Sequence, residues 1–437
     1  MCQSIGLALP TAPLQASFDG PQLTSDGGLC WLAEAATALG LCATLAQHIP
    51  EWRQGPVRHA LDTLVRQRVF QIACGYEDQN DAATLRADPL LKLVCGRLPD
   101  AAELASQPTL SRLENAVAAK ACDRLAVALV QLYLRERERE GRPAHSVLDF
   151  DGTDDPAYGQ QEGVAYHGYY GQHMYHPLLV FDGDTGQLIT AVLRPGTCHA
   201  SRGAVPVLKR LVRHLRTRWP QVTIELRADS GFAVPALYDD CEAQGIAYTI
   251  GVARNARLDA LAAALAEEAQ RQRAQTGDKV RLLAAGSYQA DSWPHARRVV
   301  YKAEALDKGL NLRFVITTRA DPPEALYRWY TQRGDHPELC IKDLTEGCFA
   351  DRLSCHRFWA NQFRLLLHSA AYWLLDTIRR WLVRRHVPPL QLSPLRLRLI
   401  KIGGWVRQRL DAVRLHLAHS HPGEPLWHLL ATRPNRL

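Results

Sequence analysis

Carboxylates gather at the end of a predicted buried strand, and they are the first feature of the chain that could carry chemistry. Asp149 and Asp151 flank Phe150 in the run 146–151, so on a strand the two acids share one face and Phe150 takes the other. Gly152 then lets the chain leave the sheet. Buried carboxylates are costly unless a cation faces them, and a divalent metal is the usual partner. The stretch therefore predicts part of a metal site.

Two further acids could complete that site. Asp229 follows a second predicted strand, 223–228, and Glu338 lies in a helical segment further along the chain. If the two strands are neighbours, Asp151 and Asp229 meet at one edge of the sheet. Three converging carboxylates would bind two hard divalent ions, which at about 3.5–4 Å apart clamp the attacking and leaving oxygens of a phosphoryl displacement. We therefore predict Asp151, Asp229 and Glu338 as catalytic residues and metal ligands.

Basic side chains surround the third acid in the run 330–342. Arg333 and Lys342 flank Glu338, and Lys342 lies one helical turn beyond it on the same face. Lys and Arg that neutralise phosphates supply most of the nonspecific affinity for DNA. We therefore predict Arg333 and Lys342, together with the neighbouring Tyr330, as DNA contacts. Two arginines that end strands at the same expected edge are further candidates, Arg227 and Arg254.

The order of elements around these acids predicts an α/β protein with a mixed sheet. From residue 146 the patterns read β-β-β-α-β-α-β, with the first three strands antiparallel, which is the arrangement of an RNase H-like core. Residues 254–310 interrupt that core with an Ala/Glu-rich helix and two strands. The strands are expected at 146–151, 173–181, 187–193, 223–228, 247–252, 280–290, 297–304 and 311–317, and helices at 205–215, 235–244, 324–333 and 337–344.

The segment before the core is helical in pattern. In residues 25–141, arginines such as Arg68 lie opposite an apolar face, so this part either binds DNA or is a bundle whose arginines face water. Asp88 before a proline predicts a helix start. Ser111 with Glu114 predicts a capping box that opens a long helix.

Length and charge divide the chain into three parts. Its 437 residues are enough for two or three domains. The formal net charge of +7 is concentrated in residues 376–437, which hold 12 Lys/Arg and 3 Asp/Glu, as expected for a segment that meets a polyanion or for a solvated tail. We predict a helical N-terminal domain that binds DNA at 1–143, a catalytic domain at 144–375 and a basic helical C-terminal region at 376–437.

Cysteine usage and hydropathy indicate a cytoplasmic protein. The 11 cysteines include no C-x-x-C pair and mostly lie in apolar surroundings, which is typical of buried thiols in a reducing compartment. The sequence shows neither a signal peptide nor a run of about 18 apolar residues, so we expect no secretion and no membrane insertion.

Several motifs taken together resemble the DDE transposases of bacterial insertion sequences, and the thirteen-eighty group in particular. The similarity runs from about residue 23 to 350 and includes Asp-Phe-Asp-Gly-Thr at the first strand end. By position, Asp151, Asp229 and Glu338 match the family's first, second and third acids. The resemblance is carried jointly by the segments 106–115, 148–156, 159–163, 167–171, 226–232 and 330–342.

The resemblance implies a fold, an activity and partners. The fold would be an RNase H-like catalytic domain with an inserted β-rich subdomain. The activity would be the cutting and joining of double-stranded DNA at the ends of the element, dependent on two Mg²⁺ ions with Mn²⁺ as an alternative. The partners would be terminal inverted repeats, target DNA and a second copy of the chain, in the bacterial cytoplasm at the nucleoid.

One spacing departs from the family's pattern. Related transposases often place the glutamate four residues after the arginine, whereas Glu338 comes one residue later after Arg333, and Lys342 stands nearer than the family's lysine. Asp335 is therefore an alternative third acid. Asp149 is likewise an alternative to Asp151 as a ligand, or a partner that supports it.

Two other functions are compatible with parts of the sequence. The run 149–153 fits the D-x-D-G-T motif of haloacid-dehalogenase-like phosphatases, with Asp149 as nucleophile, although a predicted hairpin follows where that fold needs a helix. The displaced Glu338 also fits a catalytically inactive DNA-binding relative. Phosphatase assays with an Asp149 variant and nicking assays with an Asp151 variant separate these functions.

Polar side chains near the first strand have simpler interpretations. Asp155, directly before a proline, is typical of a turn. Three histidines could contact phosphate, but an aromatic-rich surface is the preferred interpretation for His167, His173 and His176.

Overall fold

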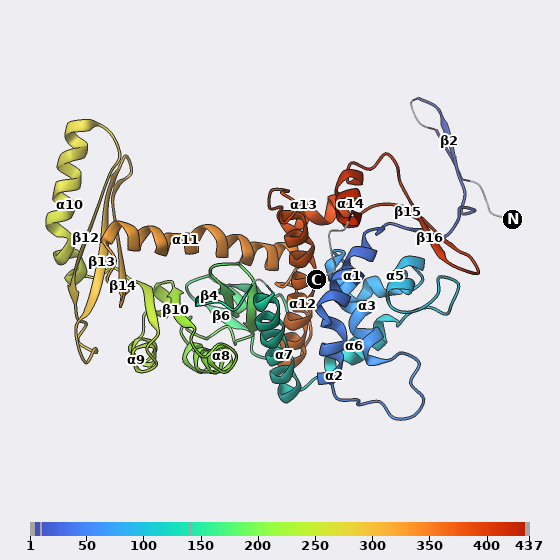
Figure 1. Cartoon of the computed structure of the whole chain (residues 1–437), viewed down its shortest axis with the longest axis horizontal. Helices are drawn as coiled ribbons and strands as arrows, with labels where there is room; N and C mark the ends of the chain where they lie inside the picture. Colours follow the sequence, from blue (N-terminus) through green and yellow to red (C-terminus); the bar gives the residue numbers. More distant parts are fainter. Residues whose placement is uncertain (1–4, 9–10, 140, 433–437) are drawn as a thin grey trace. The chain divides into compact units, whose positions relative to one another are not determined.

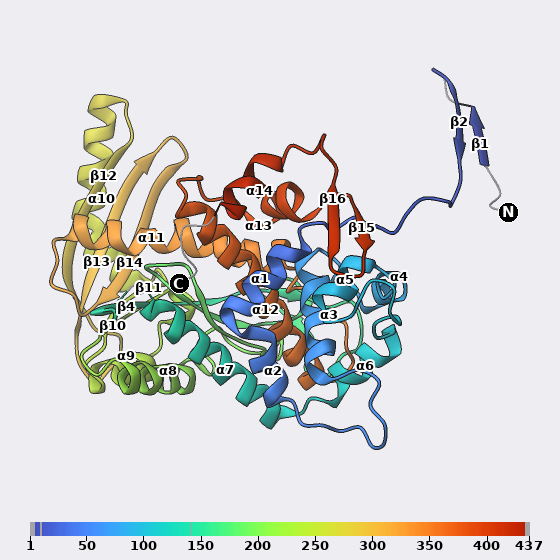
Figure 2. The same ribbon diagram turned by 45° about the vertical axis from the view of Figure 1, so that its right-hand side comes forward.

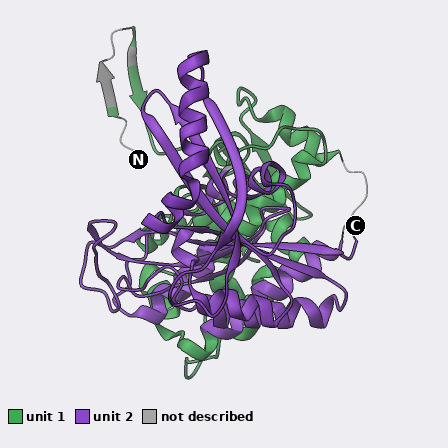
Figure 3. Cartoon of the chain, turned by 90° about the vertical axis from the view of Figure 1, so that its left-hand side faces the viewer, with its two compact units in different colours: residues 1–121, 346–349, 370–437 green, residues 122–345, 350–369 purple. Residues whose placement is uncertain are grey.

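The computed structural model describes residues 5–8, 11–139 and 141–432, with the side chains of residues 6–8, 13 and 335–337 left out. The chain forms two compact units (Figure 3). Unit 1 comprises residues 1–121, 346–349 and 370–437, and unit 2 comprises residues 122–345 and 350–369. Two of the boundaries fall inside helices, α7 (Ala119–Glu138) and α12 (Phe358–Val383), and the other two delimit the short segment 346–349.

Unit 2 is built on an eight-stranded mixed sheet in the order β12-β13-β14-β11-β10-β4-β8-β9. β4 pairs in parallel with β10, β10 pairs in parallel with β11, and the remaining pairs are antiparallel. The strands are β4 (His145–Gly152), β8 (Leu178–Asp182), β9 (Leu188–Val192), β10 (Thr223–Ala228), β11 (Ala247–Val252), β12 (Val280–Tyr288), β13 (Arg297–Leu306) and β14 (Gly309–Thr317). β8 and β9 form the predicted antiparallel hairpin. The two later core strands, β10 and β11, have the predicted bounds.

Helices cover both faces of this sheet. α8 (Ala204–Arg218) and α9 (Pro235–Ala243) lie on one face, and α11 (Pro323–Lys342) crosses the other, as the two views show (Figures 1 and 2). α8 is amphipathic, because its buried leucines and valine recur at helical spacing. Alternation along β4 separates its side chains: Phe150 packs edge-on against Phe232 with ring centroids 6.2 Å apart, while Asp149 and Asp151 face α11.

The segment after β11 extends the sheet. α10 (Ala256–Thr276) leads into β12 and β13, and β14 returns to pair with β11. The residues predicted to interrupt the core therefore add strands to the same sheet. α11 is a single helix through Pro337, where two helices were predicted, so the helix that carries Glu338 begins at Pro323.

A small antiparallel sheet lies between β4 and β8 in sequence. It consists of β5 (Asp155–Pro156), β6 (Ala165–His167) and β7 (Gln172–Tyr175), with β7 in the middle. The predicted second strand, 173–181, is thus two strands in two sheets. The reason lies at His176 and Pro177, where the chain leaves one sheet before entering the other.

Unit 1 combines the N-terminal helices with the C-terminal segment. β15 pairs with both β3 and β16, and the Arg396 guanidinium donates to the carbonyl oxygen of Ala73 at 2.8 Å. Residues 376–437 therefore fold with the N-terminal helices instead of forming a separate basic region, and they include an unpredicted hairpin. The elements are β1 (Ile5–Ala8), β2 (Pro13–Ala16), β3 (Leu23–Thr24), α1 (Leu29–Leu39), α2 (Leu41–His48), α3 (Leu61–Ala73), α4 (Ala82–Leu85), α5 (Pro89–Val94), α6 (Gln107–Ala116), α13 (Leu392–Leu395), β15 (Gly404–Gln408), β16 (Val413–Leu417) and α14 (Glu424–Ala431).

The predicted helix starts in unit 1 have different outcomes. Asp88 caps α5, because its carboxylate accepts hydrogen bonds from the amides of Leu90 and Leu91 at 2.9 and 2.7 Å. The capping box at Ser111 is wrong, since α6 already begins at Gln107. Glu114 instead accepts a 2.8 Å hydrogen bond from Arg68, and both side chains are fully buried. Arg68 therefore neither faces water nor offers a surface to DNA.

Among the described residues, no single helix is long and apolar enough to cross a membrane, and only the bent pair α1–α2, with 64° between its helices, meets the length and composition required. The cysteines in the described part of the chain are free thiols, and most of them are buried.

Candidate active site

Two aspartates come together at one edge of the large sheet. β4 and β10 run parallel with Phe150 opposite Ala228, so Asp151 and Asp229 emerge at the same ends of neighbouring strands. Asp229 caps a short 3₁₀ turn, its carboxylate accepting a 2.9 Å hydrogen bond from the amide of Gly231. Burial raises the pKa of Asp151, and the negative charge of Asp229 adds to that shift. The predicted pairing of these two acids at one edge matches the observed register.

One guanidinium favours the ionised form of Asp151. Arg333 of α11 donates a 2.7 Å hydrogen bond to Asp151 Oδ2, and the two side chains are only 13% and 14% exposed. Burial raises the pKa of Asp151 to about 6; Arg333 opposes this shift, while the charge of Asp229 adds to it. Burial and the charge of Asp229 together therefore outweigh the effect of Arg333 on this pKa.

Asp149 has a different role from Asp151. Both of its carboxylate oxygens accept hydrogen bonds from Arg227, at 2.6 and 2.7 Å, and both side chains are buried. Arg227 also donates to the carbonyl oxygen of Trp329 at 2.9 Å and lies over its indole ring. Arg227 therefore ties β4 and β10 to α11, and it is not the exposed phosphate contact that its place in the sequence suggested.

Tyr330 fastens α11 to the strand that carries Asp229. Its hydroxyl donates to the carbonyl oxygen of Ala228 at 3.3 Å. A side chain at Gly251 would come within 2.7 Å of that hydroxyl, so the close approach of α11 depends on a glycine there. Burial raises the pKa of Tyr330 to about 12, so it stays protonated. Tyr330 is placed to position the acids, in addition to any contact with DNA.

Glu338 is not grouped with the two aspartates in this structure. It is exposed on α11, and in the described part of the chain no three Asp, Glu, His or Cys side chains lie together as metal ligands would. Glu338 is five residues beyond Arg333, which places it about 140° further round a regular helix. A straight α11 therefore cannot present both side chains to Asp151. Lys342 is exposed near the end of the same helix, and the side chain of Asp335 lies outside the described residues.

The two aspartates fit a hard divalent cation. They supply oxygen donors at the same ends of neighbouring strands, and burial together with the negative charge of Asp229 raises the pKa of Asp151, so a cation placed between them would be stabilised. Arg333 now provides one positive charge at Asp151 and would share that carboxylate with a metal or release it. Glu338 would complete the set only after a rearrangement of α11.

Buried polar groups lie beside the two aspartates, and one of them is His176, which was predicted on an aromatic-rich surface but is buried. A side chain at Gly152 would lie 2.8 Å from His176 Nε2, so the residue after Asp151 is packed against that imidazole. His176 donates from Nδ1 to the carbonyl oxygen of Cys198 at 2.8 Å, and burial lowers its pKa. The buried Arg194 donates to the carbonyl oxygens of His176 and Pro177 at 2.7 and 3.2 Å. No sequence spacing could have predicted this arrangement, because the contacts join separate loops.

Asp155 is not the turn residue that was predicted. It is 2% exposed within β5, and neither carboxylate oxygen has a hydrogen-bond partner among the described residues. Burial, and then the charge of Asp351, raises the pKa of Asp155 well above its usual value. The environment of Asp155 therefore favours the protonated form of its carboxyl group.

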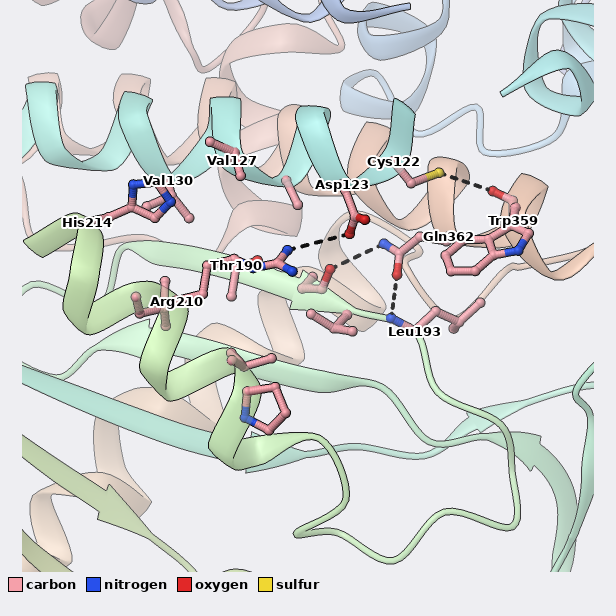
Figure 4. A pocket seen from close by; sticks show the side chains of 16 residues that line it. Cys122, Asp123, Val127, Val130, Thr190, Leu193, Arg210, His214, Trp359 and Gln362 are labelled. Carbon is pink, nitrogen blue, oxygen red and sulfur yellow. Dashed lines mark hydrogen bonds and ion pairs between the residues drawn. The ribbon is translucent and has the colours of Figure 1, made fainter. Parts of the chain in front are cut away.

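An apolar pocket of about 200 Å³ lies elsewhere in unit 2, between α7, α8, β9 and the start of α12 (Figure 4). Its floor is the edge strand β9, and the side-chain amide of Gln362 accepts a hydrogen bond from Leu193 N, just after the strand, at 2.7 Å and donates to Ala191 O at 3.3 Å. Two of the lining residues, Arg210 of α8 and Asp123 of α7, form an ion pair at 3.5 Å. The pocket contains none of the predicted site residues.

The sequence of the chain matches the model of a known protein family. The family model described as "Transposase DDE domain group 1" matches residues 8–437, almost the whole chain. The chain belongs to this family of DDE transposases. Family membership supports DNA cleavage and transfer in general, whereas the thirteen-eighty group stays a prediction.

A solved transposase structure is similar to this chain at low sequence identity. The solved structure titled "Cryo-EM structure of piggyBac transposase synaptic complex with hairpin DNA (SNHP)" matches with a TM-score of 0.42 and 12% sequence identity, over 95% of this chain and 86% of that chain. No curated protein sequence matches the chain. The assignment of this transposase therefore rests on the family match.

Proposed function

We propose that this transposase cuts and rejoins DNA at the ends of an insertion sequence by metal-assisted phosphoryl transfer. The observation that carries the proposal is the pair of aspartates at the ends of neighbouring strands, with the half-buried Asp151 bound by Arg333 and influenced by the charge of Asp229. Such a pair is what a DDE transposase needs to bind divalent ions at a scissile phosphate. The strand order β9-β8-β4-β10-β11, antiparallel and then parallel, supports an RNase H-like core.

Asp151, Asp229 and Glu338 would hold two Mg²⁺ ions, with Mn²⁺ as an alternative. The ions, when bound, would activate the attacking hydroxyl and stabilise the leaving 3′ oxygen. The chain itself supplies position: Arg227 and Asp149 lock the two strand ends together, and Tyr330 holds α11 against them. Glu338 joins the aspartates in this proposal when α11 rearranges on DNA.

DNA is the proposed partner. Arg333 and the exposed Lys342 lie on the helix that crosses the acid edge, where they would neutralise phosphates of the scissile strand. We infer that the substrates are terminal inverted repeats and target DNA, bound by a homodimer that bridges two ends in the bacterial cytoplasm. The excess of Lys and Arg in residues 376–437 supports a second DNA contact in unit 1.

The phosphatase alternative loses its nucleophile in this structure. Asp149 would have to attack a phosphate, yet both of its oxygens are bound to Arg227 inside the protein. A strand-nicking assay decides whether the chain is instead a catalytically inactive DNA-binding relative.

The test is strand nicking of a supercoiled plasmid that carries the DNA flanking the gene. With Mg²⁺, the wild-type protein is expected to nick at the ends, and Asp151→Asn is expected to bind the same DNA without nicking it. Binding without nicking by the wild type would instead identify an inactive relative. Nicking that survives Asp151→Asn would overturn the assignment of the site.

A further inference from the structure

Exposed aromatic side chains stand on a hairpin beside the acid edge. The hairpin comprises β6, the turn 168–171 and β7, and we call it the aromatic hairpin. Tyr169 is 87% exposed, Tyr166 58% and Tyr170 36%. Single exposed tyrosines are ordinary, but a group of them on one short hairpin forms an apolar patch of the kind that binds a ligand.

The rings of the aromatic hairpin contact one another. Tyr169 and Tyr170 lie edge to face with centroids 5.0 Å apart, and Tyr170 makes the same kind of contact with His167 at 5.1 Å. Tyr166 packs against His173 at 5.6 Å. These contacts restrict the ring orientations, so a ligand that stacks on them loses less side-chain entropy.

The base of the hairpin is fixed in the core of unit 2. Met174 and Tyr175 are fully buried. The Tyr175 hydroxyl donates to the carbonyl oxygen of Glu162 at 2.8 Å and accepts from Asn361 Nδ2 at 3.0 Å. Around Gly168 and Gly171 of the turn there is open space. The exposed rings therefore project from a rigid support.

The hairpin reaches the catalytic edge. Its last strand leads into His176, which packs against Gly152 next to Asp151 and contacts the ring of Tyr170 at 5.8 Å. Burial, followed by the charges of Asp154, Asp151 and Asp229, raises the pKa of Tyr170 to about 12. Tyr170 is thus close enough to the two aspartates to sense their charge.

The chemistry of the patch favours a nucleic-acid base over a phosphate. Residues 165–175 contain no Lys, Arg, Asp or Glu, so the patch offers π-faces and few charges. Aromatic side chains stack on unpaired bases of any sequence, because every base has a π-face. Enzymes that modify a base inside a duplex show that a nucleotide taken out of the helix can be stabilised by such stacking.

We propose that Tyr169 and Tyr170 stack on an unpaired base next to the bond that is cut. The inference rests on the proposed function, because the base belongs to the DNA whose scissile phosphate would lie at Asp151 and Asp229. Arg333 and the metal site would hold the phosphate, and the aromatic hairpin would hold the neighbouring base outside the duplex.

The test uses two duplexes of one sequence, the DNA that flanks the gene. One is blunt; the other is forked and carries 2-aminopurine as its first unpaired base, whose fluorescence is quenched on stacking. Wild type is expected to prefer the fork and to quench the probe. Tyr169→Ala and Tyr170→Ala are expected to bind the fork roughly tenfold more weakly and to lose quenching, with blunt-duplex affinity unchanged.

Two further variants make the test specific. Tyr170→Phe keeps the π-face and is expected to behave as wild type, which separates stacking from the hydroxyl. Tyr158→Ala removes a tyrosine that is 89% exposed in the preceding loop, and it is the matched control expected to have no effect. Matching thermal melting curves for all variants establish that folding is intact.

The outcomes distinguish this inference from the function on which it rests. The stacking role is overturned if the wild type nicks DNA and both alanine variants keep their affinity for the fork and their quenching. That result leaves the proposed function standing and points to a protein partner for the tyrosines. No DNA binding and no nicking by the wild type overturns both.

Discussion

Arg227 and Asp149 form a buried two-point ion pair, with hydrogen bonds of 2.6 and 2.7 Å that join adjacent parallel strands directly below the acid edge. The pair explains why two aspartates separated by one residue have unlike environments. Both carboxylate oxygens of Asp149 bind Arg227. Asp151, one residue before the end of the strand, instead accepts a hydrogen bond from Arg333 and is influenced by the charge of Asp229.

Removing one member of this pair is expected to destabilise the protein strongly. Asp149→Leu leaves the Arg227 guanidinium buried without its counter-ion, which typically costs about 3–5 kcal/mol. Urea unfolding of the whole chain measures the loss of unfolding free energy. The double variant Asp149→Leu with Arg227→Met is expected to recover much of it, and a double variant no more stable than the single one would contradict this view of the pair.

Glu338 is expected to matter for activity and not for stability. Because its side chain is exposed, Glu338→Gln is expected to change the free energy of unfolding by less than about 0.5 kcal/mol. Nicking is expected to fall at least about a hundredfold if the side chain joins the metal site on DNA. Full nicking activity in Glu338→Gln would move the third role to another acid, with Asp335→Asn as the next variant to test.

Lys342 is expected to contribute one phosphate contact. Lys342→Gln is then expected to lower the slope of log affinity against log salt by about one, with similar losses for all DNA sequences. Lys209→Gln is the matched control, since Lys209 lies on α8 and pairs with Asp240 at 3.1 Å. Equal slopes for wild type and Lys342→Gln would place this lysine away from the bound DNA.

His145 is expected to make stability depend on pH. The carboxylates of Asp184 and Glu225, 3.8 and 3.1 Å from its ring nitrogens, raise the pKa of His145 to about 9. Because the pKa is higher in the folded state than its usual 6.5, this contribution is complete below about pH 6.5 and is lost as the pH rises through 9.

The site of His145 is partly exposed, so the effect is expected to stay below about 1 kcal/mol. Unfolding free energies measured at pH 6 and pH 9.5 are expected to differ less in His145→Gln than in wild type. A larger difference in the variant would mean that the two carboxylates do not stabilise the imidazolium.

The sequence was sufficient where local patterns decide structure. β10 and β11 have their predicted bounds because short apolar runs lie between clear turn residues, and the Asp-Pro pair at 88–89 correctly marks the start of α5. Period-two alternation correctly placed Asp149 and Asp151 on one face of β4.

Tertiary contacts decided the rest. No local pattern shows that Arg227 pairs with Asp149, 78 residues away, or that Glu114 pairs with Arg68 instead of capping a helix. The residue before a proline usually leaves the helix, which predicted a break at His336, yet α11 continues through it. Alternation alone also could not rank Asp151 above Asp149, because burial and partners make that distinction.

The most direct test of the metal assignment is a change of ligand softness at Asp151. Asp151→Cys is expected to nick DNA at least about a hundredfold more slowly than wild type in Mg²⁺ and to recover part of that activity in Mn²⁺, which accepts thiolate ligands more readily. Asp149→Cys, at the residue bound by Arg227, is expected to show no recovery. Wild-type rates for Asp151→Cys in Mg²⁺, or equal recovery by Asp149→Cys, would contradict the central claim that Asp151 holds the catalytic metal.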